Sequence, residues 1–190
     1  MMTDDELGNM VSQTLKSSYF EIIENKRSIK LSEKNNDGNK NTKSYSFIIE
    51  LTEDLRKQKF LILKNLEELK NYAHYLKSEP KDCDYVILNE SLKLVIFIEL
   101  KNTNCRKEEI IEQLYSGKKW AEHLLFCSGY GSSELKDSIF DGWQTHYICL
   151  NYKRGRRVVQ RGSSQNQHVY RNMSANFLKG NRFQFNNLLK

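Results

Sequence analysis

The sequence predicts a mixed α/β domain, in which helices flank a central β-sheet. Residues 83–101 (CDYVILNESLKLVIFIELK) contain two apolar segments, 83–88 and 92–100, joined by a tight turn at 89–91, which is the pattern of a β-hairpin. A strongly helical pattern over residues 107–126 follows, and it leads into a further strand at 145–152. A chain that alternates strands and helices in this way is typical of a sheet with helical connections.

The second strand of this hairpin should lie at the centre of the sheet. Its sequence, LKLVIFIEL, is almost wholly aliphatic or aromatic, which is typical of a strand buried on both faces. Glu99 and Lys101 at its end are therefore unexpected, because buried charge is costly unless it is paired or binds a metal. The two residues are two positions apart, so their side chains project from the same face.

The register of the hairpin decides whether a second carboxylate lies beside Glu99. A two-residue turn at Ser91-Leu92 would place Asp84 opposite Glu99, on the same face, whereas a shift by one residue would move it to the other face. Ser-Leu is a poor two-residue turn, so a four-residue turn is an alternative. Two adjacent carboxylates and a lysine at this position are typical of a Mg²⁺ site for phosphodiester chemistry. The opposed pairs of the register are Glu90–Lys93, Leu88–Val95, Val86–Phe97 and Asp84–Glu99.

The segment before the hairpin predicts two helices and a further hairpin. Residues 4–20 have an apolar stripe at helical spacing. Strands at 21–31 and 44–51 should form an N-terminal hairpin, because the segment between them, 32–43, has no hydrophobic residue and is typical of a loop. Residues 61–76 again have the apolar spacing of a helix.

The helix over residues 107–126 has the most regular pattern in the chain. Its small residues, Gly117 and Ala121, should let the helix approach the sheet closely. Gln113 lies just beside the apolar seam, where its side chain can reach toward the end of the preceding strand; an ordinary boundary glutamine is the alternative. The seam, in which residues repeat every three or four positions, consists of Ile110, Leu114, Gly117, Ala121 and Leu124.

Length and composition indicate one folded domain. The chain has 190 residues, one proline and 38% hydrophobic residues, which is enough for a substantial core. We expect residues 1–152 to form this domain, with its core at 61–152, and residues 153–190 to form a basic extension partly packed on it. No apolar run approaches the ~18–20 residues that span a bilayer, and the acidic start has no signal-peptide core. A cytoplasmic protein is therefore expected, and cysteines without CxxC spacing argue against a zinc site.

Positive charge gathers toward the C-terminal end. The net charge is +6, and after Asp141 the sequence contains nine lysines and arginines and no acidic residue. Such an asymmetry is typical of a face that binds a polyanion, and the aromatic residues among the basic ones suit flexible or single-stranded nucleic acid. A disordered, solubilising tail is the alternative. The candidate nucleic-acid-binding residues are Lys153, Arg154, Arg156, Arg157 and Arg161.

One combination of residues resembles a known family. Asp84, then Glu99-Leu100-Lys101 at the end of an apolar strand, then a helix that carries Gln113, resembles the PD-(D/E)XK nuclease superfamily over roughly residues 63–150. The resemblance implies a restriction-endonuclease-like core, with a central four-stranded mixed sheet flanked by helices. The N-terminal hairpin and the basic C-terminal extension would be additions to that core.

The resemblance also implies a function and a set of roles. It implies a Mg²⁺-dependent nuclease, with Mn²⁺ as a substitute, that hydrolyses phosphodiester bonds of nucleic acid, with DNA favoured over RNA. Restriction, mobile-element or defence endonucleases are the expected class. Asp84, Glu99 and the main-chain carbonyl of Leu100 would hold the metal. Lys101 would orient the attacking water or neutralise charge in the transition state, and Gln113 would contact the phosphate or a metal-bound water.

Several alternatives stay open in the sequence. Three other acids could supply a further metal ligand, although solvent-facing positions explain Glu50 and Glu68, and Asp82 competes with Asp84. A homodimer is compatible with the resemblance. The alternative function is a catalytically silent nuclease fold that binds nucleic acid or an acidic protein partner.

Overall fold

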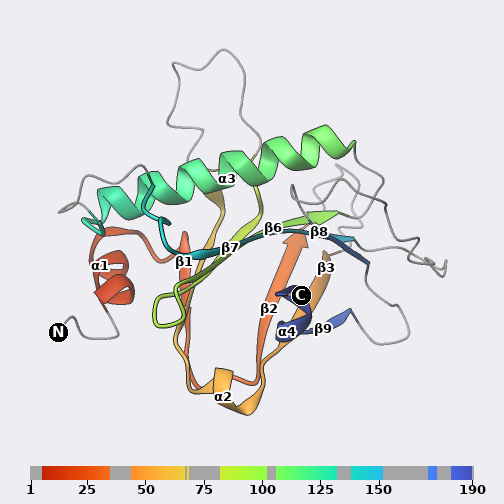
Figure 1. Ribbon diagram of the computed structural model, residues 1–190, viewed down its shortest axis with the longest axis horizontal. Coiled ribbons are helices and arrows are strands. Elements are labelled where there is room, and N and C mark those ends of the chain that lie inside the picture. Colours follow the sequence, from red (N-terminus) through yellow and green to blue (C-terminus); the bar gives the residue numbers. More distant parts are fainter. Residues whose placement is uncertain are drawn as a thin grey trace.

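The computed structural model forms two sheets and one long helix within the residues that it describes (Figure 1). The larger sheet has six strands in the order β1-β4-β5-β6-β7-β8. These strands are β1 (Phe20–Ile23), β4 (Phe60–Lys64), β5 (Tyr85–Asn89), β6 (Leu94–Lys101), β7 (Gln144–Asn151) and β8 (Arg171–Ser174). The structure describes residues 6–34, 44–66, 68, 82–101, 106–131, 138–151, 171–174 and 181–189.

The large sheet is mixed, as the sequence predicts. Its strands are antiparallel from β1 through β4 and β5 to β6, and parallel from β6 through β7 to β8. Helix α3 (Lys107–Cys127) makes the crossover between β6 and β7, which a parallel pair requires. The sheet has six strands where four were expected, because β1 and β8 extend it at its two edges. In the described part of the chain, no helix is both long enough and apolar enough to cross a membrane.

The smaller sheet contains the expected N-terminal hairpin. Strands β2 (Ser28–Lys34) and β3 (Ser44–Glu50) pair antiparallel, and β9 (Arg182–Gln184) joins β3 in parallel. The expected strand over residues 21–31 is wrong in one respect, since it breaks before β2 at Asn25, which has a φ of 55°. The part before the break becomes β1, which pairs with β4 in the other sheet.

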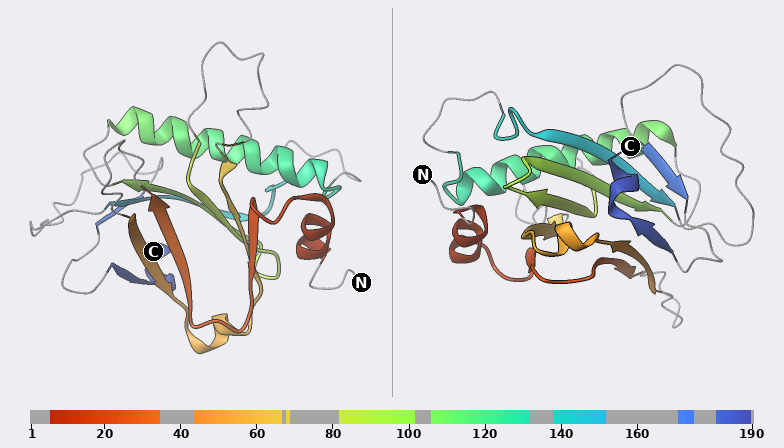
Figure 2. Two further views of the ribbon diagram at one scale, coloured as in Figure 1. Left: turned by 180° about the vertical axis from the view of Figure 1, so that it is seen from behind. Right: turned by 60° about the horizontal axis from the view of Figure 1, so that its bottom comes forward.

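Two hydrophobic cores lie on opposite faces of the large sheet. Figure 1 shows α3 along one face, and Figure 2 shows the smaller sheet and α4 (Phe185–Leu188) on the other side. The short helix α1 (Glu6–Thr14) adds to the α3 side through Leu7 and Val11. Strand β6 is buried continuously over its first seven residues, so the prediction of a central strand is confirmed. Phe185 and Leu188 are fully buried between the two sheets.

Two helix predictions are corrected by strand pairing. Residues 60–64 form β4 instead of the start of a helix, because the apolar run FLILK is buried between β1 and β5. A short apolar run has no periodicity that separates a buried strand from a buried helix. Of the rest of the expected helix, residues 67 and 69–76 lie outside the described residues. The N-terminal helix ends at Thr14 and not at Phe20, since Phe20 begins β1.

The β5–β6 hairpin has the predicted register, which includes Val86 opposite Phe97 and Leu88 opposite Val95. Its turn is the four-residue alternative, residues 90–93, in which the Lys93 N–H donates to the Glu90 carbonyl over 3.1 Å. The register places Glu90 and Lys93 opposite each other, where a favourable pair of charges is expected, but their side chains do not pair.

The two side chains of this turn have other partners. The Glu90 carboxylate accepts hydrogen bonds from the Leu7 N–H and the Tyr130 hydroxyl, both over 3.0 Å. The Lys93 ammonium lies 5.3 Å from the ring centroid of Trp143, a cation–π contact. Glu90 therefore ties the hairpin to the first turn of α1 and to the loop after α3.

Helix α3 packs against the sheet at the predicted small residue. The five residues of the predicted seam are all buried. A Cβ built on Gly117 would lie 2.1 Å from the Cys83 Sγ and 3.1 Å from the Cys83 backbone nitrogen. The helix therefore approaches the start of β5 at a distance that only glycine allows.

This packing predicts the effect of Gly117→Ala. Alanine gains about 1 kcal/mol of helix propensity, but the overlap with Cys83 should cost about 1–3 kcal/mol of overpacking and outweigh it. We expect a lower free energy of unfolding in urea titrations, partly restored by the double variant Cys83→Ala/Gly117→Ala. A Gly117→Ala protein more stable than wild type would contradict the close approach.

Candidate active site

The base of the β5–β6 hairpin brings Asp84 and Glu99 to one face of the sheet. The last pair of the ladder, Tyr85 opposite Ile98, places Asp84 directly opposite Glu99 when the register is continued by one residue. Side chains two positions apart share a face, and the neighbours Val86 and Phe97 lie in the core beneath α3. Asp84 and Glu99 therefore project from the α3 side.

Glu99 is a buried charge in the central strand. The residue is 2% exposed, and its carboxylate pairs with the Lys101 ammonium, whose side chain is 16% exposed. The pair follows from strand geometry, because residues two apart on β6 lie side by side. A buried carboxylate of this kind requires a positive partner, and Lys101 supplies it.

Asp84 extends the hydrogen bonding of the hairpin. Its Oδ2 accepts a hydrogen bond from the Leu100 N–H over 2.6 Å. The side chain thereby continues the β5–β6 ladder by one bond beyond its last residue pair. This bond holds the carboxylate at the end of β6, next to Glu99 and Lys101.

In the sequence, Asp82 competes with Asp84 as a candidate metal ligand. The structure places Asp82 against α3. It is 6% exposed and accepts a hydrogen bond from the Ser116 hydroxyl of that helix. Cys83, between the two aspartates, is fully buried against Gly117. Burial raises the pKa of the Cys83 thiol, and the negative charges of Glu99, Asp84 and Asp82 raise it further. The carboxylates of Asp82, Asp84 and Glu99 therefore all lie close enough to Cys83 to influence its thiol.

Gln113 lies on α3 one turn before the residues that touch this region. Ser116 and Gly117, three and four positions later, contact Asp82 and Cys83. Residues at these spacings are neighbours on a helix surface, and Gln113 is half-buried on the same flank of α3 as this contact. Ser116 was not predicted from the sequence, because its spacing from Gln113 was visible but its partner Asp82 was not.

The remaining candidates lie elsewhere. Glu50 is in the smaller sheet, where it pairs with Arg182 over 2.8 Å and accepts a hydrogen bond from the Gln184 side chain. Glu68 is exposed, beyond the end of β4. The basic cluster of residues 153–161 lies outside the described residues. The structure therefore assigns Glu50 and Glu68 to positions that ordinary surface acids occupy.

The donor set at the hairpin base suits a hard divalent cation. Mg²⁺ takes oxygen ligands, typically one or two carboxylates together with waters and substrate phosphate oxygens. Asp84 and Glu99 offer two carboxylates on one face. Within the described ranges, no group of three or more histidine, cysteine, aspartate or glutamate side chains is arranged to hold a metal. Two carboxylates alone would leave most of the coordination of such a cation to other ligands.

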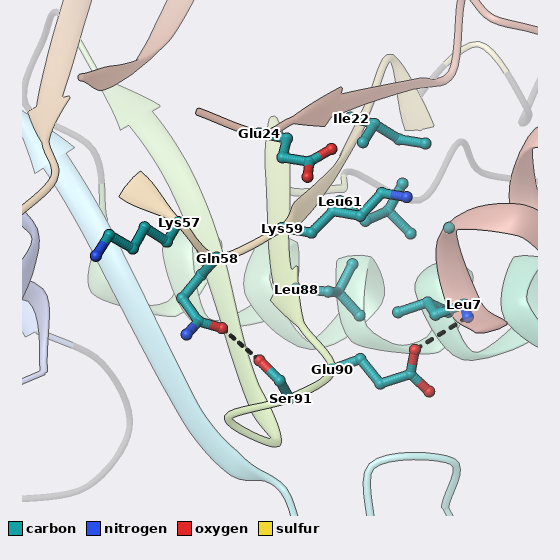
Figure 3. Close-up of a pocket in the computed structure, with 11 residues that line it drawn as sticks. Leu7, Ile22, Glu24, Lys57, Gln58, Lys59, Leu61, Leu88, Glu90 and Ser91 are labelled. Atoms are coloured by element: carbon teal, nitrogen blue, oxygen red, sulfur yellow. Dashed lines mark hydrogen bonds between the residues drawn. The ribbon is translucent and has the colours of Figure 1, made fainter. Parts of the chain in front are cut away.

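A cavity of about 430 Å³ lies at the opposite end of the hairpin (Figure 3). Its floor is apolar, with Leu61 and Leu88 among its residues, and the Ser91 hydroxyl donates to Gln58 at its edge over 2.6 Å. Neither Asp84 nor Glu99 lines it. The cavity is therefore separate from the carboxylate cluster.

Comparison of the chain with models of protein families, with curated proteins and with solved structures gives no match. The geometry of the carboxylate cluster and the motif that its residues form are therefore the features that bear on function.

The Glu99–Lys101 pair predicts a large difference between two lysine variants. Lys101→Met removes the partner of a buried carboxylate and should cost about 2–4 kcal/mol of unfolding free energy. The control is Lys119→Met, whose exposed ammonium lies 3.2 Å from Glu122 and should contribute less than about 1 kcal/mol. Chemical denaturation of both variants measures the difference; equal losses would show that the Glu99 charge is compensated by other groups.

Proposed function

We propose that this protein is a metal-dependent nuclease that hydrolyses phosphodiester bonds. One observation carries the proposal: two carboxylates and a lysine meet on one face at the end of the most buried hairpin. An enzyme of this class needs acidic oxygens to hold the cation and a cation of its own to meet the charge of the phosphate. Asp84, Glu99 and Lys101 offer both.

The strand order supports the restriction-endonuclease-like core that the motif implies. Strands β4, β5 and β6 form an antiparallel meander, α3 follows, and β7 returns parallel to β6. These four strands would be the core sheet, with β1 and β8 as added edges. The carboxylates lie where β5 begins and β6 ends, beneath the helix that carries Gln113.

The chain's own residues have distinct roles in the proposed reaction. Asp84, Glu99 and the main-chain carbonyl of Leu100 would hold Mg²⁺ or Mn²⁺, which supplies Lewis acidity and activates a water. Lys101, beside Glu99, would orient the water or neutralise charge that develops on the phosphate. An arginine would not replace it, since a planar fork and a compact ammonium fill different spaces. Gln113 would contact the phosphate or an ordered water.

The substrate proposal follows from the charge distribution of the sequence. The acid-free segment after Asp141 offers phosphate contacts, with Lys153, Arg154, Arg156, Arg157 and Arg161 as the proposed residues. We place the enzyme among DNA endonucleases of restriction, mobile-element or defence type, and a homodimer would allow both strands to be cut.

A catalytically silent nuclease fold that binds nucleic acid is the second candidate. The observation in its favour is that both carboxylates already have structural partners, Asp84 with the Leu100 N–H and Glu99 with Lys101. Such a protein would keep the hairpin and the basic segment and would lack cleavage.

Cleavage assays test the proposal by comparing variants of the carboxylate cluster with a control variant in the smaller sheet. Supercoiled plasmid and single-stranded DNA and RNA are incubated with Mg²⁺, Mn²⁺ or EDTA. Glu99→Gln and Asp84→Asn should lose about a hundredfold or more in rate, and Lys101→Ala should lose rate while it retains metal binding. Glu50→Gln changes a carboxylate of the smaller sheet and should cut at the wild-type rate.

The outcomes separate the two candidates. Cutting that continues in EDTA, or that survives Glu99→Gln in a folded protein, would contradict the nuclease mechanism. Salt-sensitive binding without cutting in either metal would favour the silent nuclease fold. Circular dichroism and thermal unfolding of each variant exclude misfolding as the cause of lost activity.

A further inference from the structure

A column of aromatic rings runs from the core to the surface beside the carboxylate cluster. Phe140 meets Phe97 edge to face at 5.8 Å, Phe97 stacks on Tyr147 at 5.3 Å with an interplanar angle of 19°, and Tyr147 meets Tyr115 at 5.3 Å. The two phenylalanines are buried, Tyr147 is half-buried, and Tyr115 on α3 is 47% exposed. The column therefore ends in an exposed ring.

The column and the carboxylates share one face of the sheet. Tyr147 lies opposite Phe97 in the β6–β7 ladder, and Glu99 follows Phe97 by two residues on the same face. Strand spacing puts the Cα atoms of Tyr147 and Glu99 roughly 8 Å apart. Burial raises the pKa of Tyr147 to about 12, with smaller contributions from Tyr115, Glu122 and Cys83, the residue that lies between Asp82 and Asp84.

The charges around the column do not exclude a polyanion. Glu122 lies on the same flank of α3, but Lys118 and Lys119 approach its carboxylate to 3.9 and 3.2 Å. The Tyr147 hydroxyl is neutral at physiological pH, because the ordinary pKa of tyrosine lies near 10 and burial raises that of Tyr147 further. A nucleotide at this position would therefore meet aromatic surface without an uncompensated negative charge from these groups.

We propose that Tyr115 and Tyr147 form a stacking platform for an unpaired base next to the carboxylate cluster. The exposed Tyr115 ring is tilted by 46° against Tyr147. An exposed aromatic ring can stack on a base, and such stacking occurs in proteins that hold single strands. A base inside a duplex already stacks on its neighbours, so the platform takes an unpaired one. The inference rests on the proposed nuclease and names its substrate class: single-stranded nucleic acid, or a duplex with an unpaired nucleotide beside the scissile phosphate.

Binding measurements in EDTA test the platform without cleavage. Fluorescence anisotropy of the full chain compares a labelled single-stranded DNA with a duplex of the same sequence. Tyr115→Ala should weaken single-strand binding about tenfold and leave duplex binding within about twofold. Tyr115→Phe keeps the ring and should bind like wild type. Phe126→Ala removes another exposed aromatic, 60% exposed near the C-terminal end of the same helix, and should have no effect.

The results that would overturn the stacking platform differ from those that would contradict the proposed nuclease activity. Equal losses for single strand and duplex, or no loss with Tyr115→Ala, would overturn the platform. A loss with Phe126→Ala as large as that with Tyr115→Ala would overturn it as well. Absence of cutting in Mg²⁺ and Mn²⁺ would contradict the nuclease alone, because the preference for single strands is measured without a metal.

Discussion

The rest of the site depends on one charge, the Glu99 carboxylate at the end of the most buried strand. An ion in this environment is tolerated only with a close positive partner, and Lys101 provides one from the same strand face. The central position of β6 between β5 and β7 fixes both side chains, because the ladders on its two sides leave the backbone no freedom to shift register. The pairing of the strands in the sheet therefore determines the positions of Glu99 and Lys101.

Helix α3 adds the remaining groups through one close contact. Gly117 lets the helix approach Cys83. This approach determines which groups the neighbouring residues of the helix can contact. Ser116 reaches Asp82 on one flank, while Tyr115 reaches Tyr147 on the other. Gln113 lies one turn earlier, toward the end of β6. The contact that determines the packing of the helix thus also sets what surrounds the carboxylates.

Local patterns predicted the parts of the fold that depend on neighbours in sequence. Hairpin pairing and strand periodicity placed Asp84 opposite Glu99 and on the face of Lys101, and helical spacing gave the seam of α3. Strand β4 was mistaken for a helix because its burial comes from pairing with β1 and β5. The Asp82–Ser116 bond and the Tyr115–Tyr147 contact join elements that are far apart in the chain or belong to different layers, so no spacing in the sequence could indicate them.

Asp84 places a carboxylate, and not merely a hydrogen-bond acceptor, at the base of the hairpin. Its observed bond requires only an acceptor for the Leu100 N–H, and the neutral side chain of asparagine would supply that acceptor equally well. Aspartate instead adds a negative charge beside Glu99 and Asp82. Burial raises the pKa of the nearby Cys83 thiol, and these charges raise it further. Like charges that share a site oppose ionisation and cost stability, unless a cation joins them. A metal held by Asp84 and Glu99, as we propose, would relieve this repulsion in addition to the pairing of Glu99 with Lys101.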